Sequence, residues 1–436
     1  MKRNPLVLIF AFVFIDLLGY SLFLPLLPYY ADTLGASPLL IGLLVASNAL
    51  AQLVASPTIG RLSDRYGRRP LLIASIVGTL VSFLLLGLVE PLGAALDGLT
   101  GGALGLGTAA LVMLFASRIL DGLTGGNIAL ARAYITDVTD EESRARGLGM
   151  IGAAFGLGFI VGPAMGGLLS NWAPATSLFA QAGLSRYAVP AFVAVVLAAL
   201  NLAGVLLWLP ESLTAERRAR MRERQGRSIL SIPELLEALK RPGFGPLLHI
   251  TFVHSLAFGI FTANFALYTQ NRLGLSDQST SYILTYVGLL VVLVQGLAIG
   301  RLTKRFEESR LVLGAALLMA PSLLAWAAVG NVPLLLVVLA PLALGGGVLN
   351  TVISSLITKS VEGDEVGGAL GLSSSLESLT RVLAPALGGV LIQWLGAWSL
   401  GVVAGVLMIW LSTFIWRRLI TDPMPPLPRQ ETTPVP

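Results

Sequence analysis

The chain alternates long apolar runs with short polar connections. Each run is close to the roughly 20 residues that an α-helix needs to cross the hydrocarbon core of a membrane. We place twelve such runs and expect a membrane-spanning helix in each: 6–29, 39–59, 70–89, 108–136, 145–169, 189–209, 244–269, 280–300, 311–329, 333–357, 368–394 and 398–416. The pattern predicts an all-α membrane protein with twelve transmembrane helices.

Composition narrows the class of protein further. The 436 residues are 55% hydrophobic and 12% charged, about half the charged fraction of ordinary soluble domains. Most of the surface must therefore face something other than water. The chain has no cysteine and only two histidines, His249 and His254, so neither a disulfide nor a metal site is expected, and no cofactor is predicted.

The net charge is +5, and the distribution of the basic residues along the chain indicates a membrane topology. If both termini are cytoplasmic, most of the 29 Lys and Arg lie in cytoplasmic segments. Only Arg186 and Arg272 lie in extracytoplasmic segments. This asymmetry is the positive-inside pattern of membrane proteins. We therefore expect a multi-pass protein of the cell inner membrane, with both termini cytoplasmic, lipid around it and no nucleic-acid partner.

The sequence repeats itself in halves. Gly-Arg-Leu at 60–62 recurs at 300–302, and Pro-x-x-Gly-Gly at 163–167 recurs at 385–389. Both offsets are near half of the 436 residues. They predict two pseudo-symmetric six-helix bundles, 1–209 and 244–419, joined by a cytoplasmic linker, 210–243, and followed by a disordered Pro-rich tail, 420–436.

The densest cluster of charge between two runs is the segment Gly-Arg-Leu-Ser-Asp-Arg-Tyr-Gly-Arg-Arg at 60–69. Lipid cannot solvate these charges, so we expect a turn where two helices leave the bilayer. The pattern G-x-x-x-D-R-x-G-R-R resembles the loop between helices two and three of the major facilitator superfamily. Over nearly its whole length the chain resembles a twelve-helix transporter of that superfamily, and in particular the drug:proton antiporters that include bacterial tetracycline exporters.

Two further segments carry this resemblance. In the fifth run, Gly-x-x-x-Gly-Pro-x-x-Gly-Gly at 158–167 is similar to a motif associated with antiporters. In the fourth run, Arg-Ile-Leu-Asp-Gly at 118–122 resembles an R-x-x-Q-G element proposed to assist proton transfer, with Asp121 in place of Gln. Glycines spaced by four form a flat stripe that lets a neighbouring helix approach closely. The expected helix-packing residues are Gly158, Gly162, Pro163, Gly166 and Gly167.

The resemblance also implies a gate on the cytoplasmic side. Asp64 and Arg68 would form a latch, with Arg68 reaching Asp137 or Asp140 at the inner end of helix four. The alternative is that the arginines only hold topology. The expected gating residues are Gly60, Asp64, Arg65, Gly67, Arg68 and Asp137.

A substrate cavity is expected where helices one, four, seven and ten meet, because the family lines its cavity with them. An aspartate inside a span faces protein or water rather than lipid, and Asp16 is such a residue. Aromatic residues follow it at i+4 and i+7, and the same spacing follows His254 in the second half. The expected substrate-binding residues are Asp16, Tyr20, Phe23, His254, Phe258, Phe261 and Asn350.

Proton coupling is expected at Asp16, Arg118 and Asp121. A carboxylate walled by aromatic rings suits a flat lipophilic substrate, particularly a cation, and proton and substrate can compete for it. A purely structural pairing of Arg118 with Asp121 is the alternative. On a continuous fourth helix, Asn127 would point away from Arg118.

Together these features predict a monomeric secondary transporter that exports a lipophilic small molecule in exchange for protons by alternating access. One alternative is a proton-independent or symport carrier of a nutrient or lysophospholipid. A second is a non-transporting membrane receptor or scaffold. The sequence has no phosphate-binding loop and no evident catalytic triad, so an enzyme is not expected.

Overall fold

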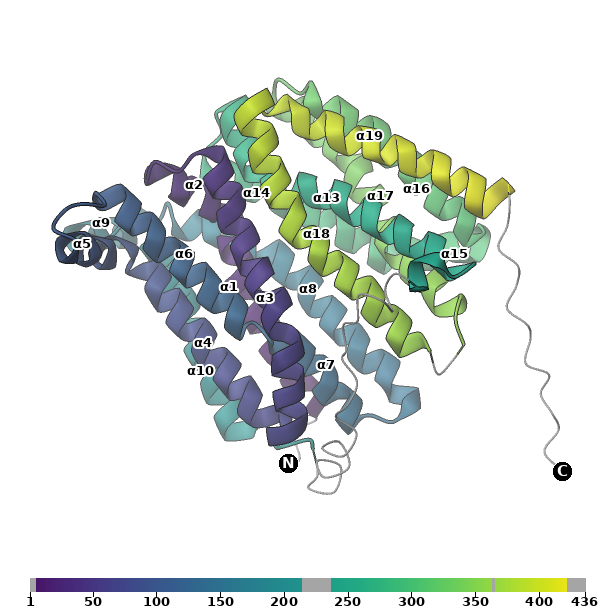
Figure 1. Cartoon of the computed structure of the whole chain (residues 1–436), viewed down its shortest axis with the longest axis horizontal. Helices are drawn as coiled ribbons and strands as arrows, with labels where there is room; N and C mark the ends of the chain where they lie inside the picture. Colours follow the sequence, from purple (N-terminus) through teal and green to yellow (C-terminus); the bar gives the residue numbers. More distant parts are fainter. Residues whose placement is uncertain (1–4, 214–236, 363–364, 422–436) are drawn as a thin grey trace. The chain divides into compact units, whose positions relative to one another are not determined.

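A computed structural model describes residues 5–213, 237–362 and 365–421 of the chain. All regular elements in these ranges are helices (Figure 1). By length and composition, 12 helical segments of the described chain can cross a membrane: Leu6–Phe23, Pro38–Tyr66, Arg68–Gly87, Leu106–Val138, Gly149–Leu169, Ala188–Trp208, Phe244–Leu273, Asp277–Arg305, Glu308–Ala327, Val332–Lys359, Val366–Leu395 and Trp398–Thr421. The predicted all-α fold with twelve spans is confirmed.

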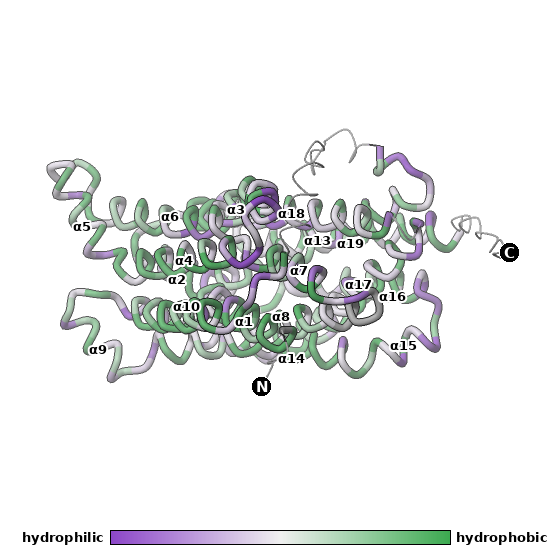
Figure 2. Tube along the Cα trace, turned by 90° about the horizontal axis from the view of Figure 1, so that it is seen from below, coloured by the Kyte–Doolittle hydropathy of each residue, from purple (hydrophilic) through white to green (hydrophobic). Residues whose placement is uncertain are grey.

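Hydrophobic residues dominate the long helices, and hydrophilic residues gather at their ends and connections (Figure 2). The apolar runs that predicted the membrane spans therefore coincide with the long helices of the structure. An α-helix satisfies all backbone hydrogen bonds within its own segment, which is why apolar runs of this length fold as helices in lipid.

The chain divides into two compact units. Unit 1 comprises 1–229, 262–289 and 381–399, and unit 2 comprises 230–261, 290–380 and 400–436, so each unit takes residues from both sequence halves. The boundaries predicted for the two bundles stay a prediction. Most of the predicted linker, 210–243, and nearly all of the predicted tail, 420–436, lie outside the described residues.

Unit 1 holds the helices of the first half and three segments of the second. Its elements are α1 (Pro5–Phe23), α2 (Leu26–Thr33), α3 (Pro38–Tyr66), α4 (Arg68–Gly87), α5 (Val89–Leu99), α6 (Leu106–Thr124), α7 (Asn127–Val138), α8 (Glu141–Leu169), α9 (Ala173–Gln181), α10 (Ala188–Trp208), the end of α13 (Phe244–Leu273), most of α14 (Asp277–Leu293) and the end of α18 (Val366–Leu395). Helix α1 packs along α8, α3 along α6, and α4 along α10.

Unit 2 holds the remaining elements. These are the first part of α13, the end of α14, η1 (Val294–Ala298), α15 (Ile299–Arg305), α16 (Glu308–Ala327), α17 (Val332–Lys359), the first half of α18, α19 (Trp398–Ile415) and η2 (Trp416–Thr421). Helix α16 packs along α17.

Three of the predicted element boundaries differ from the structure. The first run, 6–29, is two helices, because Pro25 lacks a backbone donor and the chain breaks between α1 and α2. The fourth run is also broken, at Gly125 and Gly126 between α6 and α7. The segment 60–69 is not a ten-residue turn, because α3 continues to Tyr66 and α4 begins at Arg68. Its charges lie at two helix ends joined by Gly67 alone.

The glycines of α8 let two other helices approach it. A Cβ on Gly158 would lie 3.2 Å from the Cβ of Leu17, and one on Gly162 would lie 2.8 Å from the Cβ of Ser21. Ser21 uses this closeness to donate a hydrogen bond of 2.7 Å to the carbonyl of Gly158. Gly166 continues the contact with α1, whereas a Cβ on Gly167 would lie 2.7 Å from that of Ser281 in α14.

The copied glycines in α18 have equivalent surroundings. A Cβ on Gly389 would lie 3.2 Å from the Cα of Gly42 in α3. Gly388 lies against the side chain of Asn264 in α13, and Asn264 donates to the carbonyl of Ala384 at 3.2 Å. Each glycine-rich helix therefore touches one helix of its own half and one of the other half.

Candidate functional site

Asp16 lies midway along α1 and is held by a residue of α7. Its Oδ1 accepts a hydrogen bond of 2.6 Å from Nδ2 of Asn127. Asn127 is the first residue of α7, directly after the glycine break in the fourth span. The prediction that Asn127 lies on the helix face opposite Arg118 depends on an unbroken fourth helix; it stays a prediction, because the chain is interrupted between α6 and α7.

A small cavity lies beside Asp16, between α1, α4, α7 and α10, and Asn127 and Asn201 contribute its other polar side chains. Nδ2 of Asn201 donates to the carbonyl of Phe12 at 3.2 Å. The amide oxygens of Asn127 and Asn201 are buried and accept no hydrogen bond from any residue that the structure describes. Asp16 therefore has amide groups on two neighbouring helices in an otherwise apolar setting. An asparagine within an apolar run was the sequence signal for both.

Arg118 and Asp121 form a buried pair on α6. Nη1 of Arg118 lies 3.6 Å from Oδ2 of Asp121, and the two side chains are 3% and 10% exposed. Nη2 of Arg118 also donates to the hydroxyls of Ser117 at 3.2 Å and Ser82 at 3.4 Å. Its guanidinium lies 6.0 Å from the ring centroid of Phe83. Partners on two helices thus hold the arginine.

Asn48 of α3 completes this pair, and sequence reasoning missed it. Its Nδ2 donates to Oδ2 of Asp121 at 2.9 Å and to the carbonyl of Arg118 at 3.1 Å. The side chain of Asn48 comes close because Gly122 has no side chain, and a Cβ there would collide with the backbone of Asn48. The pair is therefore braced by α3 as well as by α6.

The predicted substrate-binding residues of α1 have different environments. Tyr20 is 38% exposed, whereas Phe23 is 1% exposed and stacks on Phe83 with centroids 6.4 Å apart. Asp16 is half-buried. Within unit 1, the side chains of Tyr20 and Asp16 are therefore partly accessible, whereas Phe23 is a packing residue.

In unit 2, His254 and the two phenylalanines after it form a row of neighbouring rings on α13. The rings of His254 and Phe258 lie 5.9 Å apart, and those of Phe258 and Phe261 5.8 Å apart. Phe261 is fully buried with its ring edge-on to Trp326 at 5.1 Å. Nδ1 of His254 is buried and makes no hydrogen bond with the described part of the chain. Asn350 on α17 is exposed.

Two of the predicted gating residues, Asp64 and Asp137, contact Arg68, which is 6% exposed. Its Nη1 lies 2.6 Å from Oδ1 of Asp64, and its Nε donates to Oδ2 of Asp137 at 3.0 Å. Nη1 also donates to the hydroxyl of Ser63, and the backbone N–H of Arg68 donates to Oε1 of Glu211 at 2.9 Å. We call these five residues the Arg68 cluster. All of its members lie in unit 1 and before residue 214.

Gly67 is required by this geometry, whereas Gly60 is not. Gly67 has φ +112°, a conformation that residues with a Cβ rarely adopt. A Cβ there would also collide with the carboxylate of Glu211, which caps the start of α4. A Cβ on Gly60 would meet nothing within 4 Å. Arg65 is exposed, with its guanidinium 5.4 Å from the ring centroid of Tyr66.

Across residues 5–213, 237–362 and 365–421, His, Asp and Glu do not gather into a group of three that could hold a metal ion. The arrangement offers instead a carboxylate, a buried arginine–aspartate pair and aromatic rings, all on helices that span the membrane.

Comparison with known proteins gives the family. The model of the Major Facilitator Superfamily matches residues 9–307 and 247–435. Solute carrier family 22 member 18 of Rattus norvegicus is 28% identical over 423 residues, which cover 97% of this chain and 95% of the relative. Tetracycline resistance protein, class C, of Escherichia coli is 30% identical over 392 residues, 88% of each chain.

A solved structure agrees on the fold. The crystal structure of the human organic anion transporter MFSD10 (TETRAN) superposes with a TM-score of 0.65 at 21% identity, covering 95% of this chain and 99% of that one. Family match, relatives and fold lead to one conclusion: this chain is a multi-pass membrane transporter of the Major Facilitator Superfamily and not an enzyme.

Proposed function

We propose that this transporter exports a lipophilic small molecule in exchange for protons by alternating access. The observation that carries the proposal is Asp16, a carboxylate midway along an apolar span, held by Asn127 across two helices. A carboxylate at that depth is costly in lipid and marks an ion or proton pathway. The likeness to a tetracycline resistance protein supports export of a small lipophilic compound.

In this mechanism Asp16 binds the proton and the substrate alternately. Tyr20, exposed one turn along α1, provides an aromatic face beside it, and such a face attracts flat and cationic molecules. His254 and Phe258 provide an equivalent face on α13 in unit 2. Arg118 and Asp121 form a fixed charge pair that assists proton movement at Asp16.

The proposed setting is the cell inner membrane with both termini cytoplasmic. The basic residues support it, because Arg61, Arg65 and Arg69 lie at one end of α3 and α4 and the positive-inside rule places that end in the cytoplasm. Asn171 and Arg186, beyond the other ends of α8 and α9, then lie on the extracytoplasmic side.

The test uses purified protein in liposomes that contain a pH-sensitive dye. Lipophilic cations, tetracyclines and lysolipids are added to wild type and to Asp16→Asn, which keeps the shape of the side chain and removes its charge. Substrate-driven proton movement is expected in wild type and is expected to be lost in the variant. Glu307→Gln is the matched control, because Glu307 is a carboxylate whose side chain is 66% exposed in unit 2.

Two results would contradict the proposal. Coupled proton movement that persists in Asp16→Asn would remove Asp16 from the mechanism. Substrate movement with no proton signal in wild type would make the protein a facilitator, or a carrier of a lysophospholipid if only lysolipids move.

A further inference from the structure

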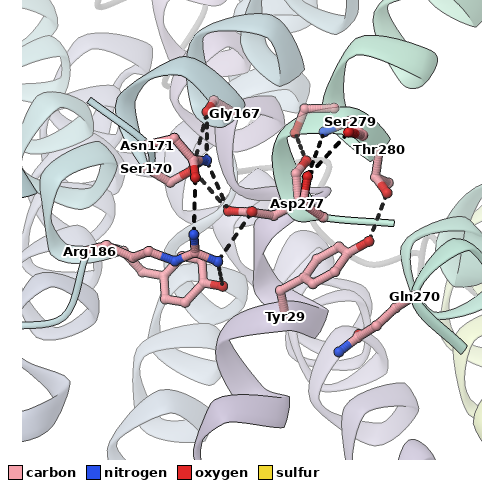
Figure 3. A network of polar contacts seen from close by, with 12 residues as sticks. Tyr29, Gly167, Ser170, Asn171, Arg186, Gln270, Asp277, Ser279 and Thr280 are labelled. Atoms are coloured by element: carbon pink, nitrogen blue, oxygen red, sulfur yellow. Dashed lines mark hydrogen bonds and ion pairs between the residues drawn. The ribbon is translucent and has the colours of Figure 1, made fainter. Parts of the chain in front are cut away.

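Another buried carboxylate lies at the other end of unit 1 from the Arg68 cluster. Asp277 is the first residue of α14 and is fully buried. Its Oδ1 accepts a hydrogen bond of 3.2 Å from Nη2 of Arg186, and its Oδ2 accepts one of 3.0 Å from the hydroxyl of Ser170 and one of 3.5 Å from Nδ2 of Asn171 (Figure 3). Every side-chain partner of this carboxylate comes from the first sequence half.

Arg186 is held in place from two sides. Its Nη1 donates to Oδ1 of Asn171 at 3.0 Å, and its Nη2 also donates to the hydroxyl of Tyr187 at 2.9 Å. Burial raises the pKa of Tyr187 to about 12, although the hydrogen bond from Arg186 opposes the shift. The phenol therefore stays neutral and can accept the bond. The Arg186 side chain is nevertheless 42% exposed, so the pair lies at the edge of solvent.

Tyr29 of α2 forms a parallel connection to the same end of α14. Its hydroxyl lies 2.7 Å from Oγ1 of Thr280 (Figure 3). It also donates to the carbonyl of Leu275 at 2.9 Å and lies 3.4 Å from Oγ1 of Thr269. We use the name Asp277 cluster for the set Tyr29, Ser170, Asn171, Arg186, Thr269, Asp277 and Thr280. All seven lie in unit 1.

Other polar contacts between the sequence halves lie at this same end. Nε2 of Gln270 donates to Oδ2 of Asp32 at 2.8 Å, and the backbone N–H of Leu39 donates to Oε1 of Gln393 at 3.1 Å. Asp32 and Leu39 flank the connection between α2 and α3. The side-chain partners of Arg68, in contrast, all belong to the first half.

We propose that the Asp277 cluster is an extracytoplasmic latch, and that the Arg186–Asp277 ion pair separates and re-forms in each transport cycle. The proposal rests on the alternating access of the proposed function. A buried carboxylate is stable only while its partners stay in place, so the cluster has two states: fully paired, or opened to water. An interface with two discrete states of this kind can be shifted by substrate or proton binding elsewhere.

The position of the pair suits such a cycle. Because Arg186 already touches solvent, its charge can be hydrated as soon as α14 moves away. Asp277 begins α14, so its carboxylate also reaches water by a short displacement. An ion pair deeper in the membrane could not be hydrated by so short a movement.

The test measures opening directly, without substrate or proton flux. The chain has no cysteine, so a single Ser281→Cys provides a unique thiol behind the latch, fully buried against Gly167. A membrane-impermeant maleimide is added to the outside of right-side-out vesicles. Asp277→Asn and Arg186→Gln are each expected to accelerate labelling at least about tenfold, because a charged hydrogen bond is lost. The double variant is expected to match the larger single effect.

Two controls separate an opened latch from a damaged fold. Arg241→Gln removes an exposed ion pair to Glu365 in unit 2 and is expected to leave labelling unchanged. Ser322→Cys, buried in α16 of unit 2, is expected to stay unlabelled in every latch variant, whereas unfolding would expose it. Unchanged labelling of Ser281→Cys in both single variants would overturn the latch. If substrate drives no proton movement in the wild-type protein, the proposed function is wrong. The labelling result for the latch does not depend on that measurement.

Discussion

The Arg68 cluster and the Asp277 cluster are both built around a buried ion pair, but they join different parts of the chain. Helix α8 begins near Asp137 and ends near Ser170, and its 29 residues span roughly 40 Å. At one end, both side chains of the Arg68–Asp137 pair are buried, at 7% and 9% exposure. At the other end, Asp277 is fully buried, whereas the Arg186 side chain is 42% exposed.

The difference shows that burial alone does not identify a moving contact. The Arg68 cluster connects α3, α4, α7 and the segment after α10, all within one sequence half. It can stay intact while the halves move and so can serve as a brace. The Asp277 cluster connects the two halves, so a motion of one half against the other must break it. The gating role predicted for Arg68 stays a prediction, and the contrast tells how to test it.

The largest effect is expected for Arg68→Gln. This change leaves the buried carboxylate of Asp137 and the half-buried carboxylate of Asp64 close together without their shared cation, a loss of about 3–5 kcal/mol for a buried pair. A clear fall in Tm is expected by thermal unfolding in detergent. Arg65→Gln removes the same charge from an exposed position and is expected to leave Tm nearly unchanged.

The same variant separates a brace from a gate. If the Arg68 cluster is a brace, Arg68→Gln lowers Tm without accelerating maleimide labelling of Ser281→Cys. A wild-type Tm combined with altered labelling would show that the cluster changes state during transport.

A smaller effect is expected for Tyr29→Phe, which removes one hydroxyl from the Asp277 cluster. A neutral buried hydrogen bond contributes about 1 kcal/mol, so labelling of Ser281→Cys is expected to increase about fivefold. Tyr282→Phe is the matched control, because the hydroxyl of Tyr282 accepts an exposed hydrogen bond from Gln278. Equal labelling in the two variants would exclude Tyr29 from the latch.

The smallest effect is expected for an exposed ion pair, Arg241–Glu365 in unit 2, with atoms 2.9 Å apart. The hydrogen bond from Arg241 lowers the pKa of Glu365 from its ordinary 4.5. A lowered pKa stabilises the folded state above 4.5, and this contribution is lost as the pH falls through the lowered value. Glu365→Gln is thus expected to lower Tm slightly at neutral pH and not in strong acid. A difference that grows in acid would contradict this assignment.

Much of the fold could be predicted from hydrophobic periodicity, because lipid requires long apolar helices wherever the chain crosses. The boundaries were less predictable where backbone chemistry decides them. Gly67 turns the chain in a single residue, and Gly125 and Gly126 interrupt a run that is apolar on both sides. Neither event changes the hydropathy pattern.

The candidate site was only partly predictable for a related reason. Asp16 is recognisable because a charge in an apolar run is rare. Asn127, Asn48 and Asn201 stand out only as polar residues within apolar runs, and because their partners lie on other helices, sequence spacing does not show what they contact. Asp277 lies just before a predicted run and resembles an ordinary helix start. Its partner Arg186 was one of two basic residues expected outside, and only the fold brings them together.

The glycines of α8 determine how this helix can move. Interlocked side chains resist sliding, because each must climb over its neighbour. Gly158 and Gly162 present bare backbone to α1, and Gly167 presents it to α14. At these three positions α8 therefore has no side chain that could interlock with the neighbouring helix. At Gly167 a small shift of α14 along α8 meets no α8 side chain, so the contacts that fix the position of α14 there are the hydrogen bonds of Ser170 and Asn171 to Asp277.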